Sequence, residues 1–223
     1  MQRDSFFYKE LFKQVDFLGG YHNAHLHLDR AYTDVSELHQ SGKAGHLSLQ
    51  EKHHQISAFH ASQFYESENL ADRLRHCLTN MAQAQTRRAD SVIDTTNDGL
   101  GLRALETAKK VSQDLADIID FRIASYSPLG FRDDDPDRWA LIEAGAEIAH
   151  FIGCLPERDD TSVYPDHVGY TETCLRMIDL TQRHKTFLHV HTDQMNAARK
   201  CCLTPSNKTT RSKQVKQRSG RFI

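Results

Sequence analysis

The sequence predicts an α/β protein of the (β/α)8 TIM-barrel type, of which only the first five βα units are present. Predicted strands alternate with predicted amphipathic helices, an order typical of parallel strands joined by helical crossovers. Barrel enzymes carry their sites at the carboxyl ends of the strands. Polar and turn-forming residues follow the predicted strands at 29–30, 94–98, 127–129, 156–158 and 193–194. A Rossmann-type sheet is not favoured, because no glycine-rich phosphate turn follows the first predicted strand.

The bulk composition limits the class of protein. The chain has 223 residues, with 28 Lys+Arg against 30 Asp+Glu, so the chain as a whole offers no strong electrostatic basis for binding nucleic acid, and only the basic tail leaves that alternative open. No apolar run approaches the roughly 18 residues of a membrane helix, and the amino terminus is charged rather than an apolar signal core. The cysteines form no C-x-x-C pair and are odd in number, as in reduced cytoplasmic proteins: Cys77, Cys154, Cys174, Cys201 and Cys202.

The amino-terminal part is predicted as a helix, a strand, a long loop and two helices. Gly19-Gly20 end the first helix, and Ser48-Leu49-Gln50-Glu51 has the spacing of a capping box that starts the second. His53, His54 and His60 lie on a polar helix, so we expect them to be solvated rather than to bind a ligand. The predicted bounds are 4–15 (helix), 21–28 (strand), 29–47 (loop), and 48–65 and 69–86 (helices).

The remaining elements repeat a strand–helix unit of about 30 residues, the length of a βαβ unit. The predicted strands span 91–95, 121–126, 147–154 and 186–191, and the predicted helices 100–113, 137–144 and 166–184. Hydrophobic periodicity is lost from about Ala197, and no acidic residue follows Asp193. We therefore expect a partial barrel over residues 1–196 and a basic, disordered tail over 197–223.

The chemistry centres on the first predicted strand, Asn23-Ala24-His25-Leu26-His27-Leu28-Asp29. Side chains alternate along a strand, so His25, His27 and Asp29 are expected on one face. Two imidazoles at this spacing suit a divalent metal, although a chain with 14 histidines also produces such pairs by chance. The fifth predicted strand ends with a further candidate ligand, His191.

These residues resemble the first-strand motif of the amidohydrolase superfamily, particularly its cytosine deaminase-like branch. The resemblance covers about residues 18 to 196 and includes the order of the later landmarks. These are Asp94-Thr95-Thr96-Asn97-Asp98 at strand two, Tyr126-Ser127-Pro128 at strand three, Cys154-Leu155-Pro156 at strand four and His191-Thr192-Asp193-Gln194 at strand five.

The resemblance implies a TIM barrel that hydrolyses carbon–nitrogen bonds in a small molecule, such as a heterocycle. It implies one divalent ion, zinc or iron, with His25, His27 and His191 as ligands, and an activated water as the nucleophile. The family's proton-shuttling Glu, three residues after the strand-five His, is Gln194 here, which hydrogen-bonds but does not titrate. Gln194 and its neighbour Asp193 are the catalytic candidates.

Other candidates contact the substrate or have ordinary structural roles. Leu129 stands about where a cytosine-reading Gln is expected, which argues against cytosine itself. Arg30 binds an anionic substrate group or is solvated, and Asp98 binds substrate or caps the next helix. Glu157 forms a substrate clamp with Arg158 or a surface ion pair.

Two further histidines lie beside the candidate ligands. His22 has the wrong strand parity, and His189 lies lower on its strand than His191. We interpret both as packing groups or as partners that orient the ligands. Asp29 is expected to be a structural neighbour of the site.

Length is the main departure from the family. A barrel takes about 250 residues, and the family draws a His from strand six and a general-base Asp from strand eight. No His follows His191 and no acidic residue follows Asp193, so we expect a truncated or frame-shifted product whose open sheet edges promote homo-oligomers. Three possibilities stay open: a carbon–nitrogen hydrolase, an inactive remnant that still binds metal, and a phosphoesterase-type metal hydrolase.

Overall fold

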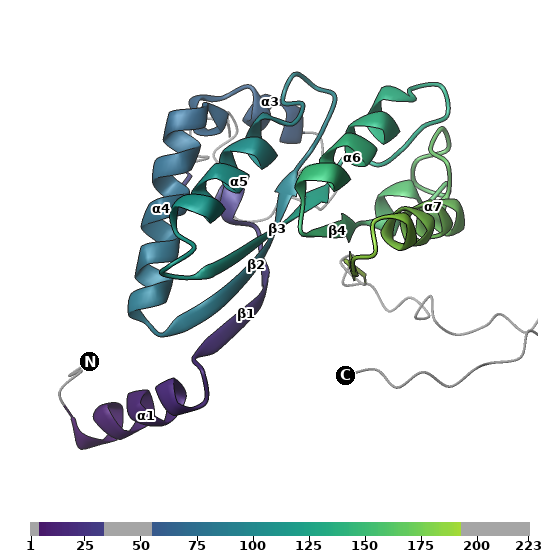
Figure 1. Cartoon of the computed structure of the whole chain (residues 1–223). Coiled ribbons are helices and arrows are strands. Elements are labelled where there is room, and N and C mark those ends of the chain that lie inside the picture. Colours follow the sequence, from purple (N-terminus) through teal and green to yellow (C-terminus); the bar gives the residue numbers. More distant parts are fainter. Residues whose placement is uncertain (1–4, 34–54, 193–223) are drawn as a thin grey trace, which may run out of the picture.

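The computed structural model describes residues 5–33 and 55–192, which fold around a five-stranded parallel sheet (Figure 1). The strands lie in sequence order and every neighbouring pair is parallel. A doubly wound sheet changes direction at a switch point, whereas a barrel keeps its strands in sequence order. The sheet is thus a curled half-barrel, which confirms the predicted fold class. Its strands are β1 (Tyr21–Leu26), β2 (Thr86–Asp94), β3 (Asp120–Tyr126), β4 (Phe151–Cys154) and β5 (Leu188–Val190).

The long helices that connect consecutive strands all cover the convex face of the sheet (Figure 1). This is the arrangement that right-handed βαβ crossovers produce. The connecting helices are α4 (Ser67–Gln83), α5 (Arg103–Asp114), α6 (Asp137–Ile148) and α7 (Tyr170–Arg183). The remaining helical segments are α1 (Phe6–Phe17), η1 (Leu28–Arg30), α3 (Ile56–His60), η3 (Gln63–Tyr65) and η4 (Pro156–Asp159).

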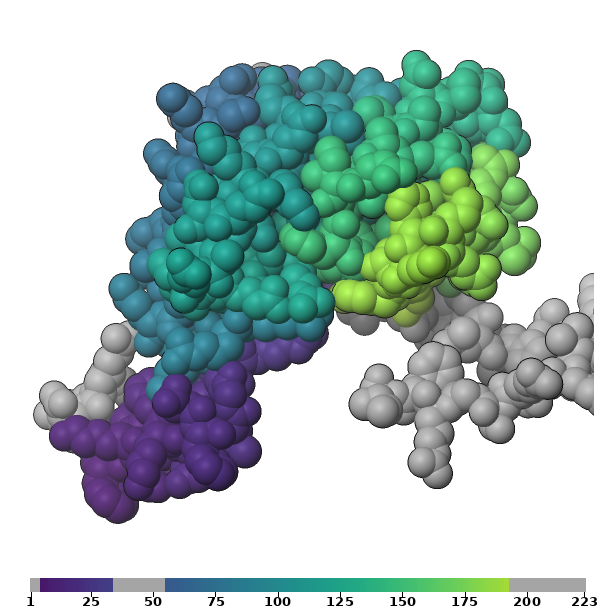
Figure 2. Space-filling view, in the orientation of Figure 1, coloured from purple at the N-terminus to yellow at the C-terminus, as the bar shows by residue number. Residues whose placement is uncertain are grey.

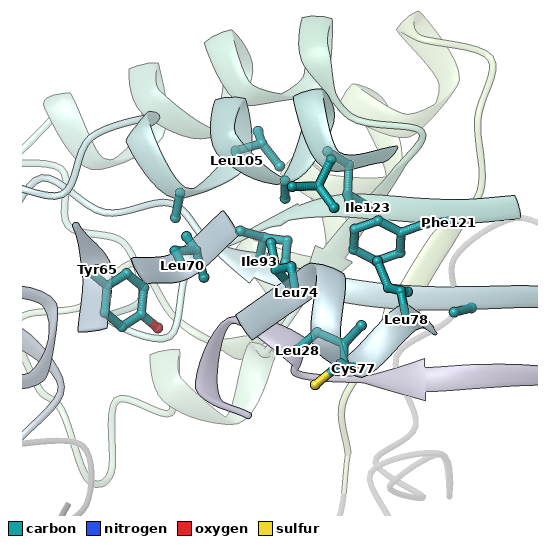
Figure 3. Close-up of a cluster of buried hydrophobic side chains, with 14 of the residues drawn as sticks. Leu28, Tyr65, Leu70, Leu74, Cys77, Leu78, Ile93, Leu105, Phe121 and Ile123 are labelled. Atoms are coloured by element: carbon teal, nitrogen blue, oxygen red, sulfur yellow. The ribbon is translucent and has the colours of Figure 1, made fainter. Parts of the chain in front are cut away.

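The main hydrophobic core lies between the sheet and helices α4 and α5 (Figure 3). Leu70, Leu74 and Leu78 recur at helical spacing on α4, and each is fully buried. Ile93 of β2 and Phe121 of β3 meet them from the sheet. This packing fixes β2 and β3, so the polar residues that follow β2 are held in place.

The concave face carries a smaller apolar cluster that forms the floor beneath the candidate site. It consists of Val92, Ala124, Tyr126, Phe151 and Leu155. Gly153 of β4 fits against this floor because a Cβ at that position would lie 3.0 Å from side-chain atoms of both Val92 and Tyr126. The inside of the half-barrel is therefore packed rather than hollow at this level.

Helix α1 projects from the sheet and forms a separate lobe in the space-filling view (Figure 2). Of its residues only Val15 is buried, whereas Phe6 and Phe17 are each 83% exposed. Asp16 pairs with Arg87 of β2 at 3.0 Å. Apart from Val15, the apolar side chains of this helix therefore do not pack into a hydrophobic core formed by the described residues.

The predicted alternation of strands and helices is confirmed, with differences at element ends. Residues 147 and 148, predicted to start a strand, continue α6 because Ile142, Gly145 and Ala146 face the core at helical spacing. Strand β2 begins at Thr86, earlier than predicted. The capping box at 48–51 and the basic tail at 197–223 lie outside the described residues. Within the described ranges, no helix combines the length and apolar character that a membrane crossing requires.

Candidate metal centre

Histidines from the two edge strands of the sheet meet on its concave face. His25 Nδ1 lies 2.7 Å from His189 Nε2, and His27 Nε2 lies 3.3 Å from His191 Nε2. The rings of His27 and His191 also contact Tyr126 of the apolar floor, with centroid distances of 5.8 and 4.9 Å. Strands β1 and β5 are not neighbours in the sheet, so the curl of the half-barrel must bring these side chains together.

The arrangement has the donor set of a transition-metal site. One potential ligand nitrogen from each of His25, His189 and His191 lies within 4.8 Å of the others. His27 adjoins this group through His191, and its buried Nδ1 has no hydrogen-bond partner among the described residues. The structure thus brings the predicted ligands His25, His27 and His191 together and adds His189 to them. Imidazole nitrogens suit zinc, iron and copper.

The orientation of His191 follows from its surroundings. Its Nδ1 lies 3.2 Å from the carbonyl oxygen of Cys154, an acceptor, so Nδ1 carries the proton and donates it there. Nε2 is then unprotonated and directed toward His27. A backbone acceptor behind a histidine is the usual way in which proteins orient a metal ligand.

Burial keeps the imidazoles of His27 and His191 neutral. Burial lowers the pKa of His27 to about 4, and the charge of the nearby Arg30 acts in the same direction. Burial likewise lowers the pKa of His191 to about 4, and burial also lowers the pKa of His189. A neutral imidazole presents the lone pair that a metal requires, so the site is ready for a cation near neutral pH.

Asp29 does not share the face of His25 and His27, and the prediction that it does is wrong. Strand β1 ends at Leu26 and the chain turns into the short helix η1, which breaks the alternation. Asp29 is fully buried, and its Oδ2 accepts hydrogen bonds from the Tyr65 hydroxyl at 2.9 Å and from the Asp94 backbone N–H at 3.1 Å. It therefore fixes the turn that follows the motif.

A buried charged network lies next to the site and was missed by sequence reasoning. His60 is 1% exposed, so the expectation that it is solvated is wrong. Its Nε2 lies 2.9 Å from Asp94 Oδ2 and its Nδ1 lies 2.8 Å from Asp98 Oδ2. Burial alone would lower the pKa of His60, but these two carboxylates outweigh burial and raise it to about 9. Its position beside Phe59 and four residues after Ile56, both buried, was the available signal.

The predicted substrate residues occupy varied positions around the barrel mouth. Arg30 pairs with Asp94 while its side chain stays 34% exposed. Asp98 also accepts a hydrogen bond from Thr96 Oγ1 at 2.7 Å, and Leu129 is buried after β3. Glu157 is half-buried in η4. The catalytic candidates Asp193 and Gln194 lie outside the described residues.

Arg158 is buried, whereas the alternative of a surface ion pair with Glu157 would require an exposed side chain. It is 8% exposed, and its guanidinium stacks on the ring of Tyr164 at 3.9 Å. Its Nε and Nη1 have no hydrogen-bond partner within the ranges that the structure covers. The residue therefore belongs to the packing of the loop that follows β4.

Comparisons with known proteins agree with this fold. No protein-family model matches the chain. An uncharacterized protein of Haemophilus influenzae is 24% identical over 205 residues, which cover 86% of this chain and 63% of that protein.

The fold is similar to that of several solved structures. Two crystal structures of 5-methylcytosine deaminase from Klebsiella pneumoniae, liganded with phosphonocytosine and with 5-fluorocytosine, are 23% and 22% identical and both superpose with a TM-score of 0.64. N-isopropylammelide isopropylaminohydrolase from Burkholderia multivorans is 16% identical, with a TM-score of 0.55. Each match covers 78% of this chain but only 39% to 40% of the solved chain. The chain thus has the fold of the corresponding two-fifths of these deaminase and amidohydrolase structures.

Proposed function

We propose that the protein is a metal-dependent hydrolase of carbon–nitrogen bonds in a small molecule, a member by descent of the amidohydrolase superfamily. The convergence of His25, His27 and His191 at one end of a half-barrel carries this proposal. The names of the similar structures support it, because both denote hydrolytic removal of an amino or alkylamino group. The substrate of this chain is proposed only at the level of that bond.

The chain's own residues fit a divalent cation. The imidazoles of His27 and His191 are neutral, His191 is oriented by the Cys154 carbonyl, and the buried Nδ1 of His27 has no hydrogen-bond partner among the described residues. When bound there, zinc or iron supplies a Lewis acid that makes water nucleophilic near neutral pH. Tyr126 and the apolar floor beneath it exclude bulk water from the inner side of the site.

The remaining candidates are assigned roles around this centre. Arg30 is proposed to meet an electron-rich group of the substrate, because its partly exposed guanidinium lies near His27. Asp98, Leu129 and Glu157 are proposed to line the mouth. Gln194 is proposed to orient the substrate by hydrogen bonds, and Asp193 to move the proton that reaches the leaving amine.

A second candidate function is metal binding without efficient turnover. It is favoured by Gln194, which stands where the resemblance expects a proton-shuttling Glu and does not titrate, since a proton-transfer group contributes orders of magnitude to such a reaction. Turnover of this chain is therefore expected to lie far below the median enzyme rate of about 10 per second.

The test is to load the purified 223-residue chain with zinc or iron and to assay amine and ammonia release from amino-heterocycles and amides. Slow release that a chelator or His191→Ala abolishes would support the hydrolase. Bound metal without any release would favour the second function. Cleavage of phosphodiesters in a parallel panel would instead assign the site to a phosphoesterase and contradict the proposal.

A further inference from the structure

We propose that His189 is itself a metal ligand, so that one divalent ion is held by imidazoles from both edge strands and cross-links β1 to β5. This inference rests on the metal site of the proposed function, but it changes the ligand set and adds a structural role. The interpretation of His189 as an outer partner of the ligands would then not hold.

The position of His189 favours ligation over packing. Its Nε2 lies 2.7 Å from His25 Nδ1, and its ring lies 4.8 Å from that of His25 and 5.3 Å from that of His191. Within the described ranges, no carboxylate forms an ion pair with it. By contrast His22, which directly precedes the first-strand motif, has its Nε2 2.9 Å from Asp90 Oδ2. His189 is therefore available to a metal, whereas His22 is already bound by a carboxylate.

The spacing of the nitrogens is compatible with a tetrahedral ion. Nitrogens bound to zinc at about 2.0–2.1 Å lie about 3.3 Å from one another in a tetrahedron. The His27–His191 pair has that separation, 3.3 Å, in the structure. The His25–His189 pair, at 2.7 Å, is closer by about 0.6 Å. One nitrogen from each of His25, His189 and His191 lies within 4.8 Å of the others, and His27 adjoins this group through His191.

Four protein ligands have a consequence for the role of the ion. Zinc sites with four protein ligands are structural, whereas catalytic sites keep one position open. With His189 bound, the ion would join residues that are 164 positions apart in sequence and hold together β1 and β5, the edge strands of the sheet in the described part of the chain. Departure of His189 would leave the three-histidine set and open the position that hydrolysis needs. The residue thus would decide between a closed and an open site.

The experiment measures zinc affinity of the full chain by competition with a chromophoric chelator, together with the absorption spectrum of the cobalt(II) form. The variants are His189→Ala, His191→Ala and the matched control His22→Ala. We expect His22→Ala to bind as the parent does and His189→Ala to bind at least about 10-fold more weakly, with a changed cobalt spectrum. Zinc should also raise the melting temperature of the parent more than that of His189→Ala.

Each other result overturns the inference in a distinguishable way. Unchanged affinity and spectrum in His189→Ala, with weakened binding in His191→Ala, would remove His189 and leave the site of the proposed function intact. No zinc binding by the parent would remove both. If circular dichroism shows that His189→Ala does not fold, His189→Gln replaces it. Parent-like zinc affinity in His189→Gln would equally refute ligation by His189.

Discussion

The buried imidazole of His60 should make the stability of this protein depend on pH in a way that one substitution removes. In the folded chain His60 lies between Asp94 and Asp98, and both ring nitrogens are within hydrogen-bond distance of a carboxylate oxygen. These contacts raise its pKa from 6.5 to about 9 against the opposing effect of burial. The folded state therefore holds a proton that the unfolded chain releases between these values.

The sign and size follow from linkage. Because the folded pKa is the higher one, the stabilisation is fully present below pH 6.5 and is lost as the pH rises through about 9. Each pKa unit corresponds to about 1.4 kcal/mol, so the free energy of unfolding should lose about 3 kcal/mol across this window. The side chain is fully buried, so solvent screening does not reduce this figure greatly.

The assay is urea unfolding followed by the fluorescence of Trp139, the only tryptophan, at a series of pH values from 6 to 10. His60→Gln should be less stable than the parent at pH 6, and the difference should shrink by about 3 kcal/mol by pH 10. His76→Gln, which replaces an exposed imidazole on α4, is the control and should track the parent. If the difference in free energy of unfolding between the parent and His60→Gln stays constant with pH, His60 is not held protonated between the two carboxylates.

Further predictions concern single contacts. Because burial lowers the pKa of His27 and His191 to about 4, their imidazole resonances in the metal-free chain, assigned by substitution, should not titrate between pH 7.5 and 5.5; a titration near 6.5 would contradict this. Tyr65→Phe removes the donor to Asp29 and should lower the free energy of unfolding by about 1–3 kcal/mol, whereas no loss would show that this bond is dispensable. Gly153→Ala places a methyl 3.0 Å from side-chain atoms of Val92 and Tyr126. It should lower the free energy of unfolding by about 1–3 kcal/mol in the same urea assay. Parent-like stability would show that Val92 and Tyr126 shift to accommodate the methyl at no cost.

Periodicity and motif spacing were sufficient to predict the fold. The strand–helix alternation predicts a parallel sheet, and the absence of a glycine-rich turn favours a barrel, as the sequential strand order confirms. His25 lies in β1 and His27 follows its last residue directly, and their rings lie 5.2 Å apart, in line with the predicted spacing. These are local properties, set by the geometry of a strand.

The parts that sequence reasoning missed depend on tertiary structure. The contact between His25 and His189 requires the curl of the sheet, which strand patterns do not encode. His60 is buried because α3 turns it toward Asp94 and Asp98, which lie 34 and 38 residues away in sequence. Asp29 left the predicted face because the strand ends one residue before His27. Strand ends are the least certain boundaries in a sequence, and side chains beyond them lose their parity.

The central claim is that histidines of β1 and β5 bind one metal ion, and X-ray absorption at the zinc edge of the loaded chain tests it most directly. The account predicts nitrogen scatterers at about 2.0–2.1 Å, with the multiple scattering of imidazole rings, at one zinc per chain. His25→Ala with His191→Ala should abolish this signal. Sulfur scattering near 2.3 Å, or a signal that survives the double substitution, would place the metal elsewhere and contradict the claim.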